Sequence, residues 1–202
     1  MKEKTFITIT RQYGSGGLYI AETLAKAMGV KCYNRNIVAA AAESLDTFED
    51  VQSVVEKSYD TPNDFVASLS ALVRQGVPRQ NQMYVQQARI IRELAECDES
   101  AVFVGRCADY ILRDVPNHFS FFFYADDDCR RQRAKEYYRD FSFQDVLDVD
   151  NKRRSYYNYY TGRKWGDPQN YDLMINTTNL TAEQAVKIIF RAVRPRPLGL
   201  GI

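Results

Sequence analysis

A β-prone segment, a glycine-rich loop and an amphipathic helical pattern follow one another directly near the start of the chain. They cover residues 5–10, 14–17 and 18–28, in that order. The strand carries the chain to the edge of a sheet, and glycines let backbone N–H groups converge without side chains in the way. The N-terminus of the next helix attracts anions. This order predicts a phosphate-binding loop.

The loop departs from the usual G-x-x-x-x-G-K-S/T pattern at three positions. Arg11 stands where the first glycine is expected, Gly17 replaces the lysine, and Leu18 replaces the hydroxyl residue. Because that lysine ordinarily reaches the phosphates, the cation of this site must come from elsewhere. Arg11, at the strand end, is the candidate. The alternative is a surface arginine paired with a neighbouring carboxylate.

Length and composition indicate one domain and argue against several kinds of partner. The 202 residues can bury one substantial core, and a net charge of +1 provides no field for DNA or an anionic membrane. No apolar run approaches the roughly 20 residues that span a bilayer, and no signal-peptide pattern opens the chain, so we expect a cytoplasmic protein. The four cysteines lack the spacing of a zinc site or disulfide framework and are expected to be reduced thiols.

Apolar patterns typical of strands and helices alternate along the chain. Strands are predicted at residues 5–10, 30–33, 101–105, 119–125 and 171–177. Two of them, 101–105 and 119–125, are apolar over most of their length, which indicates central parallel strands. Helical patterns separate the strands, so we expect an α/β fold with right-handed crossovers. Residues 195–202 are predicted to be irregular.

Arg106 and Asp109 follow a buried strand, and open α/β sheets bind ligands at the carboxyl ends of their strands. An arginine here can hold a phosphate with two hydrogen bonds, and Asp109 can orient it or bind a metal-bound water. A structural ion pair between the two residues is the alternative. Cys107 is expected to be a small buried residue without a chemical role.

A third charged group contains Arg130 and Arg133, three residues apart on one helical face, and the acidic and basic residues at 150–154. Phosphoryl transfer depends on positioning and charge neutralisation, so a movable segment that brings guanidinium groups over the phosphoryl suits such an enzyme. A solvated helix face is the alternative.

Five tyrosines and a tryptophan lie between residues 156 and 171, interleaved with basic residues. Such a segment can stack on single-stranded nucleic acid. Packing or an interface is the more common use of aromatic residues, and the near-neutral net charge argues against nucleic acid.

Taken in order, these motifs make the chain resemble the cytidylate kinase-like family, a branch of the nucleoside monophosphate (NMP) kinase group of P-loop proteins. The resemblance covers nearly the whole length and rests on residues 9–17, 104–112 and 156–176. It implies a three-layer α/β P-loop NTPase fold with a five-stranded parallel sheet in a single domain, residues 1–194. A helical NMP-binding insertion at 37–96 and a lid-like segment at 140–168 complete the expected architecture.

The resemblance also implies ATP with Mg²⁺ as phosphoryl donor and a nucleoside monophosphate such as CMP as acceptor. The donor phosphates would contact Gly14, Ser15, Gly16 and Gly17. Catalysis would use four arginines, namely Arg11, Arg130, Arg133 and Arg153. The acceptor would be bound by Tyr33, Asn34, Arg35, Arg106, Asp109 and Asp150. No residue is assigned to the metal.

Departures from the family pattern leave two functional hypotheses. Cytidylate kinases have the loop lysine and an aspartate after the arginine that Arg106 resembles, whereas this chain has Gly17 and Cys107. Loss of a transition-state cation lowers the rate by about 10² to 10³ unless another group replaces it.

The first hypothesis is an ATP-dependent phosphotransferase acting on a nucleoside monophosphate or similar small acceptor. The second is a catalytically weak, nucleotide-binding regulatory or interaction protein on the same fold. Neither requires nucleic acid or a membrane as partner. The aromatic segment and the helical insertion offer surface for a homo-oligomer.

Overall fold

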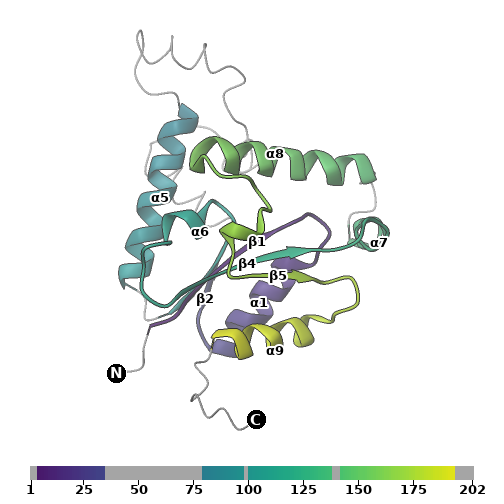
Figure 1. Cartoon of the computed structure of the whole chain (residues 1–202), viewed down its shortest axis with the longest axis horizontal. Helices are drawn as coiled ribbons and strands as arrows, with labels where there is room; N and C mark the ends of the chain where they lie inside the picture. Colours follow the sequence, from purple (N-terminus) through teal and green to yellow (C-terminus); the bar gives the residue numbers. More distant parts are fainter. Residues whose placement is uncertain (1–3, 35–78, 98–99, 138–141, 194–202) are drawn as a thin grey trace.

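The computed structural model describes residues 4–34, 79–97, 100–137 and 142–193. Five strands form one parallel sheet in the order β2-β3-β1-β4-β5. They are β1 Phe6–Arg11, β2 Lys31–Tyr33, β3 Ala101–Val104, β4 His118–Tyr124 and β5 Leu173–Asn176. Because β1 is central, the loop that follows it opens at the middle of the carboxyl edge (Figure 1). The predicted five-stranded parallel sheet is confirmed.

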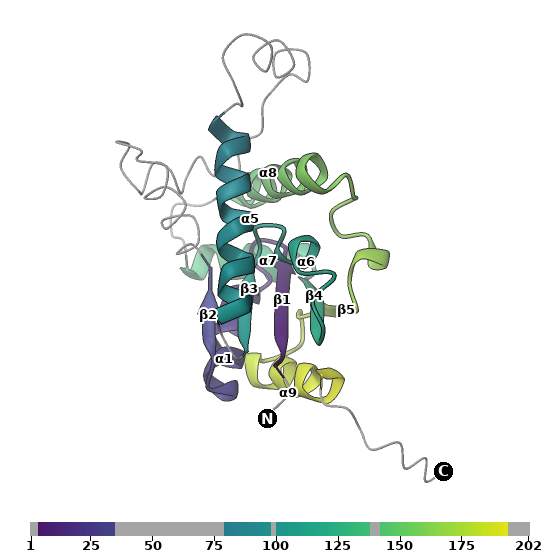
Figure 2. The same ribbon diagram turned by 90° about the vertical axis from the view of Figure 1, so that its left-hand side faces the viewer.

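Helices cover both faces of this sheet and give three layers (Figures 1 and 2). On one face lie α1 Gly17–Met28 and α9 Ala182–Val193. On the other lie α5 Arg79–Cys97, α6 Ala108–Ile111 and α8 Phe143–Thr161. α7 Asp127–Tyr137 follows the carboxyl end of β4, and a short 3₁₀ helix, Pro168–Asn170, precedes β5.

Each face of the sheet has its own apolar core, because the central strands are buried on both sides. Phe121 and Phe123 of β4 pack with the core on the α1 side, whereas Phe122 packs with the core on the α5 side. Burial of one such side chain stabilises the fold by about 1.5–3 kcal/mol. The largely apolar sequence of β4 is therefore explained by burial on both faces of the sheet, as the sequence pattern indicates.

The helix α8 was not among the predicted elements, although its start carries a recognisable signal. Ser142 Oγ accepts a hydrogen bond from the Asp145 N–H (3.2 Å), and the Asp145 carboxylate accepts one from the Ser142 N–H (2.7 Å). This reciprocal pair is a capping box. Gly162, with φ of 67°, ends the helix.

Tyrosines of the aromatic segment join α8 to α5. The Tyr160 ring stacks on Tyr84 at 4.2 Å between centroids, with an angle of 10° between the planes. The Tyr160 hydroxyl donates to Asn81 Oδ1 (3.2 Å), and the Tyr156 hydroxyl donates to Gln87 Oε1 (3.3 Å). The packing interpretation of this segment is confirmed for these tyrosines, and α8 is a helix fixed along one side.

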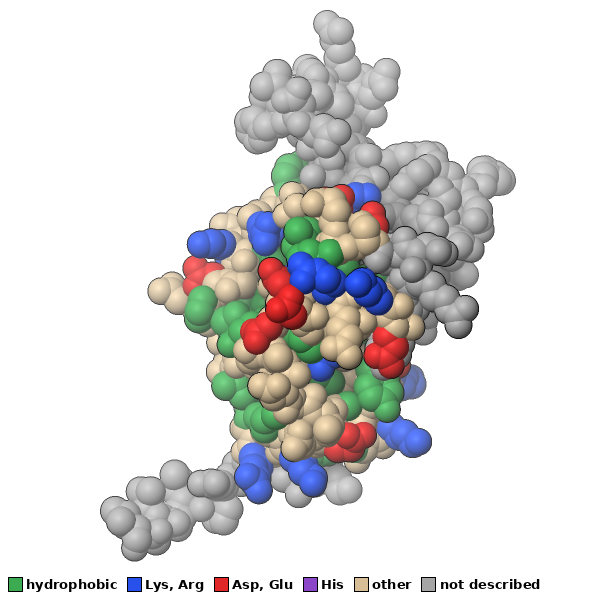
Figure 3. All heavy atoms as spheres, turned by 90° about the vertical axis from the view of Figure 1, so that its right-hand side faces the viewer, with side chains coloured by type: hydrophobic (Ala, Val, Ile, Leu, Met, Phe, Trp, Pro, Cys, Tyr) green, Lys and Arg blue, Asp and Glu red, His purple; other side chains and the backbone are tan. Residues whose placement is uncertain are grey.

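Several predictions concern residues outside the described ranges. They include Arg35, most of the helical insertion and the tail at 195–202. Of the helices that are described, none is long and apolar enough to cross a membrane. On the face shown in Figure 3, described acidic and basic side chains lie close together.

Candidate functional site

The loop between β1 and α1 has the backbone that a phosphate-binding loop requires. Gly14 and Gly16 have φ values of 77° and 76°, which residues with a Cβ rarely adopt. A Cβ on Gly14 would also lie 3.0 Å from the carbonyl oxygen of Arg130. The Ser15 hydroxyl donates to the Gln12 carbonyl (2.8 Å) and accepts from the Gly17 N–H (3.3 Å), so it shapes the loop.

The start of α1 offers donors to an anion. Its N-cap is Gly16, no side chain caps it, and no acidic residue lies in its first turn. The first N–H groups of a helix have no intrahelical carbonyl partner, and the helix dipole favours negative charge at this end. The geometry of the loop and of the start of α1 is compatible with the predicted anion site.

A cleft of about 670 Å³ opens over the loop and along α1. Its volume falls within the range of small-molecule sites, which is about 300–1,000 Å³. Three of the predicted catalytic arginines line it, namely Arg11, Arg133 and Arg153. A further wall comes from residues 180–182 at the start of α9. No sequence pattern marked that wall. Thr181 and Gln184 form a capping box there, which identifies a helix start and not a ligand.

A second, much smaller cavity of about 20 Å³ lies at the carboxyl end of β3. Arg106, Cys107 and Tyr157 are among the residues that line it. Arg11 and Arg153 line both this cavity and the larger cleft. These two arginines therefore lie between a nucleotide-sized cleft and the arginine predicted to hold the acceptor.

Arg130 does not line either cavity, contrary to the expectation that it reaches over the phosphates. It is 3% exposed, and its Nε donates to the Tyr13 carbonyl (2.8 Å). Its two terminal nitrogens bind Asp127 (3.0 Å) and Asp150. Arg130 thus attaches α7 to the loop and holds it in place.

Arg133, on the same helical face, does reach the cleft. Its Nη1 donates to the Ser15 carbonyl (3.1 Å), and its Nη2 donates to the Thr177 carbonyl (2.9 Å). The Thr177 hydroxyl also donates to the Ser15 carbonyl (2.7 Å). Arg133 therefore joins the loop to the end of β5 while it lines the cleft, and the sequence pattern had not identified Thr177.

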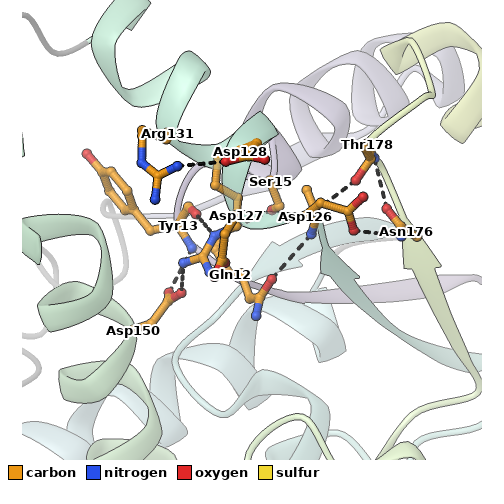
Figure 4. Close-up of polar contacts among 12 residues, drawn as sticks. Gln12, Tyr13, Ser15, Asp126, Asp127, Asp128, Arg131, Asp150, Asn176 and Thr178 are labelled. Carbon is orange, nitrogen blue, oxygen red and sulfur yellow. Dashed lines mark hydrogen bonds and ion pairs between the residues drawn. The ribbon is translucent and has the colours of Figure 1, made fainter. Parts of the chain in front are cut away.

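Asp150 connects α8 to the loop (Figure 4). Its carboxylate accepts a hydrogen bond from the Tyr13 N–H (2.7 Å), binds Arg130 and lies 3.5 Å from Arg153 Nη1. The same Arg153 nitrogen donates to the Arg11 carbonyl (3.1 Å), and the guanidinium lies 5.3 Å from the Tyr13 ring centroid. Asp150 was predicted to bind the acceptor, but here it contacts the loop and lines neither cavity.

Two predicted acceptor residues, Tyr33 at the end of β2 and Asn34 directly after it, were expected near the smaller cavity. Tyr33 stacks on Phe103 at 5.2 Å between ring centroids and packs against the core on the α5 side. Tyr33 and Asn34 are not among the described residues that line the cleft or the smaller cavity.

Asp109 is buried between β1, α6 and α8. Its carboxylate accepts hydrogen bonds from the Tyr157 hydroxyl (2.7 Å) and the Thr10 hydroxyl (3.4 Å), both of which belong to residues that line the smaller cavity. Burial raises the pKa of Asp109 to about 6, although both hydrogen bonds oppose this shift. Asp109 therefore does not line the cavity itself but contacts it through the hydroxyls of Thr10 and Tyr157.

The raised pKa makes the free energy of unfolding depend on pH. The folded state binds this proton more tightly than the unfolded state, so Asp109 stabilises the fold below pH 4 and the effect is lost as the pH rises through about 6. Relative to Asp109→Asn, the wild type should lose roughly 2.5 kcal/mol between pH 4 and pH 7, since one pKa unit is worth about 1.4 kcal/mol and the loss begins just below pH 4. Urea unfolding of both proteins across this range measures the difference. His118, whose pKa burial lowers to about 4, is common to both and cancels. A difference that does not change with pH would contradict the prediction.

Comparisons with known proteins agree with this architecture. The profile of the cytidylate kinase-like family matches residues 6–179. An uncharacterized protein from Eubacterium ventriosum ATCC 27560 has a similar structure, with a TM-score of 0.69 and 25% identity over 96% of this chain and 100% of that one. No curated protein matches.

Two solved structures of proteins named as kinases share the fold at lower identity. Shikimate kinase from Bacteroides thetaiotaomicron has a TM-score of 0.55 and 10% identity, over 94% of this chain and 98% of that one. A gluconokinase from Sinorhizobium meliloti 1021 has a TM-score of 0.56 and 12% identity, over 96% and 93%. These likenesses concern the fold alone. The family profile, in contrast, spans the loop, both cavities' arginines and all five strands, and the chain belongs to the cytidylate kinase-like family.

Proposed function

We propose that the protein is a Mg²⁺-dependent phosphotransferase that moves a phosphoryl group from ATP to a nucleoside monophosphate, CMP-like, or a similar small acceptor. The observation that carries this proposal is the position of Arg11 and Arg153, which line both the cleft and the Arg106 cavity. Charge develops on the phosphoryl group between donor and acceptor, and guanidinium groups placed there stabilise the transition state.

Arg11 supports the donor side of the proposal. Its side chain is half-buried and lines the cleft, and its guanidinium makes no hydrogen bond or ion pair with the described residues. The alternative interpretation of Arg11, an ion pair with a neighbouring carboxylate, therefore does not hold among the described residues. A guanidinium placed beside the loop N–H groups can take the role of the missing lysine.

Arg106 supports the acceptor side. It is 4% exposed, and its backbone has a φ of 59° between Gly105 at 73° and Cys107 at 55°. Left-handed conformations of residues other than glycine cost about 1–3 kcal/mol and cluster at functional sites. A buried arginine held in this way at the end of β3 suits the binding of an acceptor phosphate.

The donor set of the cleft fits a nucleotide that carries its own metal. Glu22 is the one carboxylate among the described residues that line the cleft, and no group of three acidic, cysteine or histidine side chains in the described ranges could hold a metal ion. Mg²⁺ is usually bound by one or two carboxylates and substrate phosphates, and it keeps several waters. When bound, Mg²⁺ would neutralise phosphate charge.

The test is ADP release from Mg²⁺-ATP by the purified protein, with CMP, dCMP, UMP, AMP and GMP offered separately. Shikimate and gluconate serve as acceptors without a phosphate. We expect turnover with a nucleoside monophosphate and none with the two unphosphorylated acceptors.

The glycine at position 17 favours a second candidate, a nucleotide-binding regulatory protein with weak catalysis. A folded protein that binds ATP and turns over no acceptor would favour that candidate and contradict the kinase proposal. Binding of ATP itself is measured by calorimetry on the same preparation.

A further inference from the structure

Tyr19 is exposed to an unusual degree for an aromatic residue near a ligand site. Its side chain is 63% exposed, the highest value among the large apolar side chains in the described ranges. It lies in the first turn of α1 and lines the cleft. An exposed aromatic ring contributes little to burial in the core, so this ring is available to a ligand.

The position of Tyr19 suits contact with the base of a nucleotide whose phosphates lie on the loop. It follows Gly17 by two residues, a rise of about 3 Å along the helix. The cleft continues from the loop along α1, and its lining also includes Leu180 and Ala182 from the neighbouring helix start. Phosphates at the loop therefore place the rest of the nucleotide beside an aromatic ring and aliphatic side chains.

Polar atoms at this end of the cleft are largely used by the protein. The Thr181 N–H donates to Gln184 Oε1 (2.8 Å), and the Thr181 hydroxyl accepts from the Gln184 N–H (3.3 Å). The Thr177 hydroxyl donates to Ser15, as described above. Glu22 is exposed, so its carboxylate is hydrated. A hydrogen bond from the amino group of a base to this carboxylate would replace one from water and would add little to the binding free energy. These atoms offer little to distinguish one base edge from another.

We propose that Tyr19 is a stacking platform for the base of the donor nucleotide and that the donor site accepts ATP and GTP with little discrimination. The proposal rests on the proposed function, because it needs the triphosphate on the loop. Stacking is tolerant of base identity, since every base has a π-face, whereas discrimination requires hydrogen bonds to the base edge. A nucleoside triphosphate is thus the donor class, and ATP and GTP are the two members that test the proposal.

The experiment is titration calorimetry of the wild type and two variants, Tyr19→Ala and Tyr19→Phe, with ATP, GTP and tripolyphosphate in Mg²⁺. We expect Kd values for ATP and GTP in the wild type to agree within about tenfold. Tyr19→Ala should raise both by about tenfold or more and leave the Kd of tripolyphosphate unchanged, because loss of one aromatic platform costs about 1–3 kcal/mol. Tyr19→Phe keeps the ring and should bind like the wild type.

Tyr159→Ala is the matched control, since this tyrosine is 40% exposed on α8 and does not line the cleft. Unchanged ATP binding by Tyr19→Ala would overturn the proposal. A parallel loss of tripolyphosphate binding would also overturn it, because Tyr19 would then support the loop and not the base. A wild type that binds neither ATP nor tripolyphosphate would instead remove the proposed function itself.

Discussion

Replacing Arg11 by alanine is expected to lower kcat/KM for acceptor-dependent ADP release by about 10² to 10³, the effect of losing one transition-state cation. Its guanidinium lies between the cleft and the Arg106 cavity, and no described residue pairs with it. The initial rate with the preferred acceptor measures the loss. Arg191→Ala, an exposed arginine on α9, is the control and should act like the wild type. Full activity of Arg11→Ala would contradict the assignment.

A related prediction concerns Gly17, because a side chain at position 17 would occupy the space that the Arg11 side chain fills. A Cβ on Gly17 would lie 2.7 Å from Arg11 Cβ, 3.0 Å from its Cγ and 3.1 Å from Phe123 Cδ2. Gly17→Lys alone should therefore lose activity and stability, although it restores the usual loop pattern. In the double variant with Arg11→Gly, both arginine contacts disappear and only the edge of Phe123 must shift slightly.

We expect the double variant to be more active than either single variant, which is the non-additivity of residues in direct contact. A stable and active Gly17→Lys single variant would show that the two positions are independent. The chain would then have lost the lysine without a steric reason.

Asp150→Asn is expected to lower the free energy of unfolding by about 3–5 kcal/mol, since removal of one partner leaves a buried charge uncompensated. The asparagine can still accept from the Tyr13 N–H, but Arg130, at 3% exposure, loses its buried carboxylate and keeps only the exposed one of Asp127. Urea unfolding at pH 7 measures the change. Asp148, at an exposed position on the same helix, provides the control. The free energy of unfolding of Asp148→Asn should stay within about 0.5 kcal/mol of the wild-type value. Equal urea midpoints for Asp150→Asn and the wild type would contradict the prediction.

The sheet and the loop could be predicted because their determinants are local in sequence. A strand buried on both faces is mostly apolar, as residues 119–125 are. The loop glycines adopt backbone conformations that few other residues tolerate. The capping box of Thr181 and Gln184 is likewise local in sequence, and both of its hydrogen bonds are present.

The roles of the charged residues could not be predicted, because they depend on contacts between distant parts of the chain. Tyr13 and Asp150 are 137 positions apart, and no periodicity connects them. Arg130 and Arg133 share a helical face, yet the first is enclosed by Asp127, Asp150 and Tyr13 while the second lines the cleft. Which of the two arginines is enclosed depends on how α8 packs against the loop.

The stacked tyrosines between α5 and α8 reduce the free energy that ligand binding would have to spend on ordering α8. A wall that must close over a ligand reduces the apparent affinity by the fraction of molecules in the open form. Here Tyr84, Tyr156 and Tyr160 already attach α8, and Asp150 attaches the same helix to the loop. We therefore expect little ordering of α8 on binding. Contacts that Arg153 makes with a bound nucleotide would then contribute directly to affinity and to stabilisation of the transition state.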